Sequence, residues 1–124
     1  MLDTESRQMS EQLQQCIRLC EECHNICLET VSYCLQMGSQ MSALHIEPGH
    51  MTLLMDCAEI CQTSANFMLR ASRQHPRTCA VCAEICDLCA RSCEQFADDA
   101  QMRACADACR RCAESCRQMA GHTC

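Results

Sequence analysis

The sequence predicts an all-α protein, an antiparallel up-down four-helix bundle with a cysteine-lined core. Of its 124 residues, 17 are cysteine. Sixteen of these recur at steps of three and four residues, which places them on one face of a helix. The breaks between the four cysteine runs are short, and short connections favour antiparallel neighbouring helices. A strand, with its period of two, would not align these cysteines on one face.

The first helix is expected over about residues 4–37, with Gly38 as the residue that ends it. Its cysteines fall within an arc of ~60° at 100° per residue. They are Cys16, Cys20, Cys23, Cys27 and Cys34. Apolar residues flank this stripe and widen the apolar arc to ~220°, whereas one bundle seam needs roughly 100°. The excess predicts a surface that is buried in an oligomer.

The second helix is expected over about residues 49–72, after Pro48, since proline suits the first turn of a helix. This helix is the poorest in thiols. Its stripe consists of His50, Cys57, Cys61, Ser64 and Met68.

The third and fourth helices carry the densest cysteine runs. The third is expected over about residues 76–96, and its stripe spans ~80°. It contains Cys79, Cys82, Cys86, Cys89 and Cys93. The fourth is expected over about residues 98–120, with Asp98 as its N-cap and Gly121 at its end. Its stripe spans ~60° and contains Cys105, Cys109, Cys112 and Cys116.

Length, charge and composition narrow the class of protein. The length predicts one domain over residues 1–124. With one Tyr, two Phe and no Trp, an ordinary apolar core would be thin, and buried thiols are the available filling. A net charge of −6 without clustered basic residues argues against a nucleic-acid partner. No apolar run approaches the roughly 18 residues of a membrane span. The N-terminus lacks the features of an export signal, which predicts a cytoplasmic protein with reduced thiols.

Several alternatives can explain a chain this rich in cysteine. Disulfides within a helix are strained, because side chains four residues apart hold their Cβ atoms roughly 5–6 Å apart and a disulfide needs about 3.5–4.5 Å. An inert core does not explain sixteen thiols on four facing stripes. A thiol redox sensor needs one or two exposed, low-pKa cysteines. Iron–sulfur clusters commonly use cysteines from loops. No catalytic constellation is visible, so we expect a protein that is not an enzyme.

Metal storage is the interpretation that the stripes favour. Thiolates select Cu(I), zinc or iron–sulfur clusters. Structural zinc uses separate sets of four ligands and leaves two negative charges for each Zn²⁺ held by four thiolates. Each Cu(I) ion neutralises the charge of one thiolate, and sulfurs that bridge neighbouring ions can continue this arrangement along a column. We therefore expect multiple Cu(I) ions per chain, with zinc or another soft metal as the alternative.

The stripes from Cys16 to Cys34, from Cys79 to Cys93 and from Cys105 to Cys116 resemble those of the bacterial copper storage proteins. This resemblance covers almost the whole chain. It implies a four-helix bundle that stores and detoxifies Cu(I) on its core cysteines, and a homotetramer. The high cysteine count resembles the cytosolic members of that family. A copper chaperone is a further expected partner.

Soft ligands other than cysteine collect at one end of the expected bundle. That end gathers Met37, Met41, His50, Met51, Met55 and Met102. Thioethers bind Cu(I) without adding charge, so they should hold it more weakly than thiolates. We therefore expect Cu(I) to enter there, through Met41, His50, Met51 and Met55. Of the other histidines, His24 is expected beside its stripe. Those near the breaks are expected in solvent, namely His45, His75 and His122.

Overall fold

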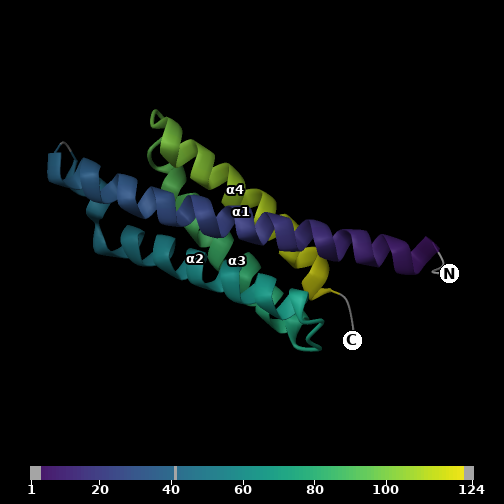
Figure 1. The fold of residues 1–124 in the computed structure, drawn as a ribbon. Coiled ribbons are helices and arrows are strands. Elements are labelled where there is room, and N and C mark those ends of the chain that lie inside the picture. The colour runs from purple at the N-terminus through teal and green to yellow at the C-terminus, as the bar shows by residue number, and fades with distance from the viewer. Residues whose placement is uncertain (1–3, 41, 122–124) are drawn as a thin grey trace.

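The four helices form an antiparallel up-down bundle, as Figure 1 shows for a computed structural model of the chain that describes residues 4–40 and 42–121. The helices are α1 (Thr4–Gln40), α2 (Pro48–Leu69), α3 (His75–Glu94) and α4 (Ala100–Ala120), with a short 3₁₀ helix η1 (Ala43–Ile46) between α1 and α2. Each helix packs against two neighbours, so α1 contacts α2 and α4, and α3 contacts the same pair. The predicted fold class is confirmed, and the described residues contain no strand.

The end of α1 differs from the prediction, because the helix continues past Gly38 to Gln40. A Cβ atom at position 38 would overlap the side chain of Ile46 in η1. The glycine therefore permits close packing of η1 on α1 and does not end the helix. The predicted loop from 38 to 48 is correspondingly shorter and contains η1.

Most other boundaries move by one to three residues, whereas α1 begins at Thr4 and α4 ends at Ala120, as predicted. Helix α2 ends at Leu69, where residue 72 was predicted, because Ala71 takes the left-handed conformation with φ of 58°. Helix α4 begins at Ala100, and its N-cap is Asp99, not Asp98. The Asp99 Oδ1 atom accepts a hydrogen bond from the Met102 backbone N–H at 3.2 Å.

Cysteine fills the centre of the bundle along its whole length. The remaining core positions are mostly alanine, with Leu54, Met68, Met102 and Met119 as its largest apolar side chains. Larger apolar residues of α1, such as Leu13 and Ile17, are partly buried along the flank of this core. Small side chains on the central axis therefore leave the thiols facing one another.

The two ends of the bundle differ in composition. We call the end formed by the last turns of α1 and α3 and the first turns of α2 and α4 the His50 end, and the opposite end the Met68 end. Helix α1 spans 37 residues, about 55 Å at 1.5 Å per residue. Its first turns extend past the other helices beyond the Met68 end (Figure 1). In the described part of the chain, every helix is too polar or too short to cross a membrane.

Candidate metal centre

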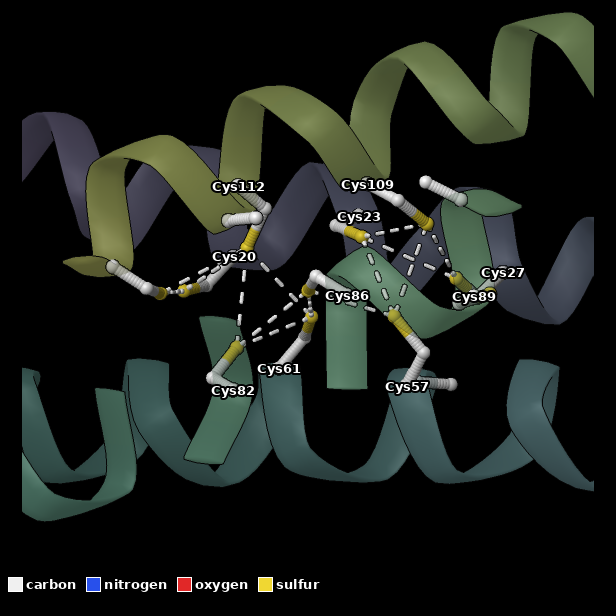
Figure 2. Packing of buried hydrophobic residues seen from close by; sticks show 14 of the residues in the cluster. Cys20, Cys23, Cys27, Cys57, Cys61, Cys82, Cys86, Cys89, Cys109 and Cys112 are labelled. Carbon is white, nitrogen blue, oxygen red and sulfur yellow. Dashed lines mark hydrogen bonds between the residues drawn. The ribbon is translucent and has the colours of Figure 1, made fainter. Parts of the chain in front are cut away.

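The sixteen cysteines of the four stripes all point into the bundle axis and have no exposed surface. Figure 2 shows the middle of this column, where thiols from all four helices face one another. None of the sixteen is in a disulfide. The predicted residues that lie together are Cys16, Cys20, Cys23, Cys27, Cys34, Cys57, Cys61, Cys79, Cys82, Cys86, Cys89, Cys93, Cys105, Cys109, Cys112 and Cys116.

The sulfur atoms are spaced as metal ligands are. The Sγ atom of Cys20 lies 3.5 Å from that of Cys116, and the Sγ atom of Cys57 lies 3.6 Å from that of Cys86. The Sγ atoms of Cys27 and Cys109 are 4.0 Å apart. Two sulfurs bound at about 2.3 Å to one ion lie roughly 3.8 Å apart in tetrahedral geometry and roughly 4.0 Å apart in trigonal geometry. The column can therefore bind soft metal ions with little movement of the helices.

The possible metal-binding groups overlap. Within each group, the sulfur atoms lie within 4.8 Å of one another. The groups are Cys20, Cys82, Cys112 and Cys116; Cys23, Cys61, Cys86 and Cys112; Cys23, Cys27, Cys57 and Cys109; and Cys16, Cys79 and Cys116. Because Cys23, Cys112 and Cys116 each belong to two groups, these cysteines can bridge ions, and the column does not divide into separate sites.

Burial affects the protonation of Cys34, at the His50 end of the column. It raises the pKa of the Cys34 thiol to about 11, because the thiolate is the form that a low-dielectric interior disfavours. At neutral pH this thiol is therefore protonated and uncharged without metal. A soft cation that binds it displaces the proton, so binding at this position is coupled to proton release.

The Cys34 thiol, at the His50 end of the column, contacts two uncharged side chains that can bind Cu(I). The Cys34 Sγ atom lies 3.5 Å from His50 Nε2 and 3.8 Å from Met102 Sδ. Burial lowers the pKa of His50, which favours the neutral imidazole. Its Nδ1 atom lies 2.7 Å from Ser92 Oγ. When Nδ1 donates to Ser92, the lone pair on Nε2 faces the Cys34 sulfur.

A hydrogen-bonded cluster that the sequence did not reveal closes the same end. The Asp99 Oδ2 atom accepts a hydrogen bond from the Tyr33 hydroxyl at 2.6 Å and lies 3.1 Å from His45 Nε2. Burial opposes ionisation of Asp99, but these hydrogen bonds outweigh it and lower its pKa. The His45 ring packs on Phe96 with centroids 4.4 Å apart. The expectation of a solvent-exposed His45 was therefore wrong, because η1 turns its ring inward, where it is 6% exposed.

The residues expected at the copper entrance occupy different environments. The His50 side chain contacts a core thiol, that of Cys34. Met51 is half-buried on the flank of the core, and Met55 is 49% exposed on α2. Met41 lies outside the described residues, as do His122 and Cys124.

The His24 side chain of α1 lies beside the core and contacts α2. The His24 Nδ1 atom lies 2.7 Å from the Ala58 carbonyl oxygen, so this ring links α1 to α2 beside the cysteine stripe, as its offset from the stripe predicts.

A pocket of about 450 Å³ runs from solvent to His50 and is bordered by Leu44, Leu53 and Phe96.

Comparison with known proteins gives one family. A family profile described as copper storage protein matches residues 5–121. The protein Nmul_A1745 from Nitrosospira multiformis is 50% identical, with a TM-score of 0.82 over 90% of this chain and 96% of that one. A Cu(I)-bound structure of the copper storage protein BsCsp3 is 34% identical, with a TM-score of 0.80 over 89% and 99%. Apo-Csp3 from Bacillus subtilis is also 34% identical, with a TM-score of 0.77 over 87% and 98%.

Curated protein sequences give no match. The family profile nevertheless spans nearly all of the chain, and the similar structures share both its bundle and about a third to a half of its residues. The chain belongs to the copper storage protein family.

Proposed function

We propose that this chain stores Cu(I) as many ions along its thiol column, and that storage protects the cytoplasm from free copper. The observation that carries the proposal is the overlap of the metal-binding groups at Cys23, Cys112 and Cys116. Shared thiolates suit a monovalent soft cation, because one Cu(I) per thiolate leaves the buried column neutral. The Cu(I)-bound BsCsp3 structure supports the same cargo.

Two alternatives fit the structure less well. Zinc held by four unshared thiolates leaves two negative charges per ion, and the overlapping groups do not provide the separate sets of four ligands that structural zinc uses. A thiol redox sensor needs an exposed, low-pKa thiol. Each of the sixteen described cysteines is fully buried, and burial raises the pKa of Cys34.

A Cu(I) titration of reduced protein against a competing chelator tests the proposal. With bridging thiolates, the load should reach roughly 14–20 Cu(I) per chain, because bridging soft ligands can match one metal per ligand. A parallel titration with Zn²⁺ serves as the control and should saturate at fewer ions. Saturation with Cu(I) at four ions or fewer would contradict storage.

We propose the sixteen cysteines of the column as the ligands, and a non-enzymatic role for the chain. A copper chaperone is the proposed partner for delivery or collection, since Cu(I) passes readily between soft ligands by exchange. The cytoplasm is the proposed compartment, because the reduced column needs an environment that keeps thiols reduced.

We propose a homotetramer that buries the outer apolar face of α1. On this helix Leu28 is 48% exposed and Leu35 is 56% exposed, and residues seven apart lie on one helix face. Light scattering should give a tetramer mass for the wild type and a smaller mass after Leu28→Glu and Leu35→Glu together. An exposed polar position on the opposite side of α1, Gln15→Glu, is the control. A wild-type monomer would refute the assembly.

We propose that Cu(I) enters at the His50 end. The pocket beside His50 reaches solvent, and His50 contacts the terminal thiol Cys34. A neutral imidazole and thioether bind Cu(I) more weakly than thiolates do, so affinity rises from Cys34 inward. His50→Leu should slow loading from a Cu(I) donor, while the final load changes by no more than one ion. His24→Leu, on the flank of the core, should load at the wild-type rate.

The predicted methionines are tested separately from His50, because Met51 lies on the flank of the core and Met55 is exposed, whereas Met41 lies outside the described residues. The joint variant Met41→Leu, Met51→Leu and Met55→Leu keeps volume and apolar character, so its stability should change little. Slower loading of this variant assigns an uptake role to the methionines. Wild-type loading makes them packing or surface residues and leaves His50 as the entrance ligand.

A further inference from the structure

The Met68 end of the column has a ligand pattern of its own. Thiols from three helices meet there: Cys16 of α1, Cys79 of α3 and Cys116 of α4, with sulfur atoms within 4.8 Å of one another. The Cys16 and Cys116 sulfurs are 3.7 Å apart. Helix α2 supplies no thiol at this level. Its core position is occupied by Met68, which is 1% exposed.

The methionine sulfur lies beside one thiol of this triad, Cys79. The Cys79 thiol donates a hydrogen bond to Met68 Sδ across 3.8 Å, the separation of two sulfurs on one tetrahedral ion. A thioether that faces a buried thiol points its lone pairs toward the place where the thiol proton would be exchanged for a metal. Leucine would fill the same volume but could not accept this hydrogen bond.

We propose that Cys16, Cys79, Cys116 and Met68 form a terminal Cu(I) site of three thiolates and one thioether. This inference rests on the proposed storage function and adds a ligand to the sixteen cysteines. It places the bound ion at the Met68 end of the column, away from the proposed entrance at His50.

Charge explains why the fourth ligand is a thioether. Inside the column, thiolates such as Cys23 and Cys112 can serve ions on both sides, so each negative charge is shared. At the last level there are no further ions beyond Cys16 and Cys79. A fourth thiolate there would add a buried negative charge without a cation to balance it, which is costly. The neutral Met68 sulfur completes the coordination without that charge.

The neighbouring core position of α2, Ser64, also lacks a thiol. Ser64 lies one helical turn from Met68, is fully buried, and donates its hydroxyl to the Thr78 carbonyl oxygen at 3.1 Å. Its hydroxyl proton is therefore committed to the backbone of α3, and its oxygen is a harder ligand than the sulfur that Cu(I) prefers. Met68 is thus the soft side chain that α2 contributes to the core beyond Cys61.

Copper-edge anomalous maps from Cu(I)-loaded crystals of the wild-type protein test the site directly. We expect a copper peak bonded to Met68 Sδ and to the thiolates of Cys16, Cys79 and Cys116. Copper throughout the column with none bonded to Met68 would overturn the inference and leave storage intact. A wild-type load of four ions or fewer in solution would instead overturn storage itself.

Release kinetics test the same site in solution. Met68→Leu should release one Cu(I) per chain to a strong chelator about tenfold faster than the wild type, in the range seen when a metal ligand loses support. Met119→Leu is the matched control, because Met119 is also 1% exposed at this end and is not proposed as a ligand. Both variants should keep wild-type helicity without metal. Equal release from Met68→Leu and the wild type would overturn the inference.

Discussion

At the scale of single residues, cysteine has two roles in this molecule. Without metal, a protonated thiol such as Cys86 packs as a small apolar group. With metal, the same atom becomes a charged ligand. Residues with larger side chains would push the sulfur atoms apart. In this core the Cys86 sulfur lies 3.6 Å from that of Cys57 and 3.6 Å from that of Cys61.

Loss of a central thiol should reduce the copper load. Cys86→Ala removes a sulfur that lies within 3.8 Å of Cys57, Cys61 and Cys82, so saturation should fall by roughly one Cu(I) per chain. Chelator-competed titration measures the change. Cys124→Ala is the control. It removes the one cysteine that follows Gly121 and should leave the load unchanged. Equal loads for the two variants would exclude Cys86 as a ligand.

The raised pKa of Cys34 predicts how the stability of the metal-free protein depends on pH. An unfolded thiol has a pKa near 9, whereas burial raises that of Cys34 to about 11. Between these values the folded protein binds more protons than the unfolded chain, so rising pH favours unfolding. Chemical denaturation of reduced apoprotein should show stability that is intact below pH 9 and falls by about 2 kcal/mol or more toward pH 11.

The Cys34→Ala variant separates this thiol from the rest of the core. It should lose stability less steeply with pH than the wild type, because one group that binds its proton more tightly on folding is gone. An identical slope would show that Cys34 is not responsible for it.

The sequence predicted the core residues well and the polar residues poorly. Helical spacing alone identifies all sixteen buried cysteines of the described residues, because one stripe per helix must face the axis. It could not identify His45 or Tyr33, because their contact with Asp99 depends on how η1 folds back over the bundle end. From the sequence, Met68 is only a position of the α2 stripe without a thiol. That it lies beside Cys79, at the level of Cys16 and Cys116, is visible only once the four helices are aligned in space.

At the scale of elements, the start of α4 links three parts of the chain. Asp99 caps this helix through the Met102 N–H and also holds Tyr33 of α1 and His45 of η1. Gly38 acts at the same end by letting η1 lie against α1. The His50 end is therefore closed by side-chain contacts between elements and not by a long loop.

Asp99→Ala should destabilise the protein by about 2 kcal/mol, because it removes a helix cap and leaves the buried His45 and the half-buried Tyr33 without their acceptor. Thermal denaturation of apoprotein measures the loss. Asp98→Ala is the matched control: Asp98 is exposed, so its replacement should cost less than about 0.5 kcal/mol. A similar loss of stability in both variants would contradict the assignment of Asp99 as the N-cap of α4.

The element boundaries show where local signals compete. Glycine often follows a helix, yet Gly38 continues α1, because the contact with Ile46 requires a residue without a side chain. Either of two adjacent aspartates can cap a helix, and tertiary contacts with Tyr33 and His45 select Asp99. Helix type and order could be predicted from periodicity, whereas these termini depend on partners distant in sequence.

At the scale of the whole molecule, the bundle should be folded before it binds copper. The reduced thiols pack against alanine and against the partly buried Leu13, Ile17 and Ile85 of the flanks, so burial of apolar surface does not require metal. Circular dichroism of reduced, metal-free protein should show a mostly helical chain, and Cu(I) loading should change it little. A mostly coiled apoprotein, as in zinc fingers, would contradict this.

The shared sulfurs also determine what a half-filled protein looks like. Because Cys23, Cys112 and Cys116 each serve two groups, a given number of ions can be distributed along the column in many arrangements of similar energy. This degeneracy gives intermediate occupancies a configurational entropy that a set of separate, distinct sites lacks. Copper uptake should therefore rise smoothly with supply, and a cell would hold a population of partly filled molecules with room to buffer in both directions.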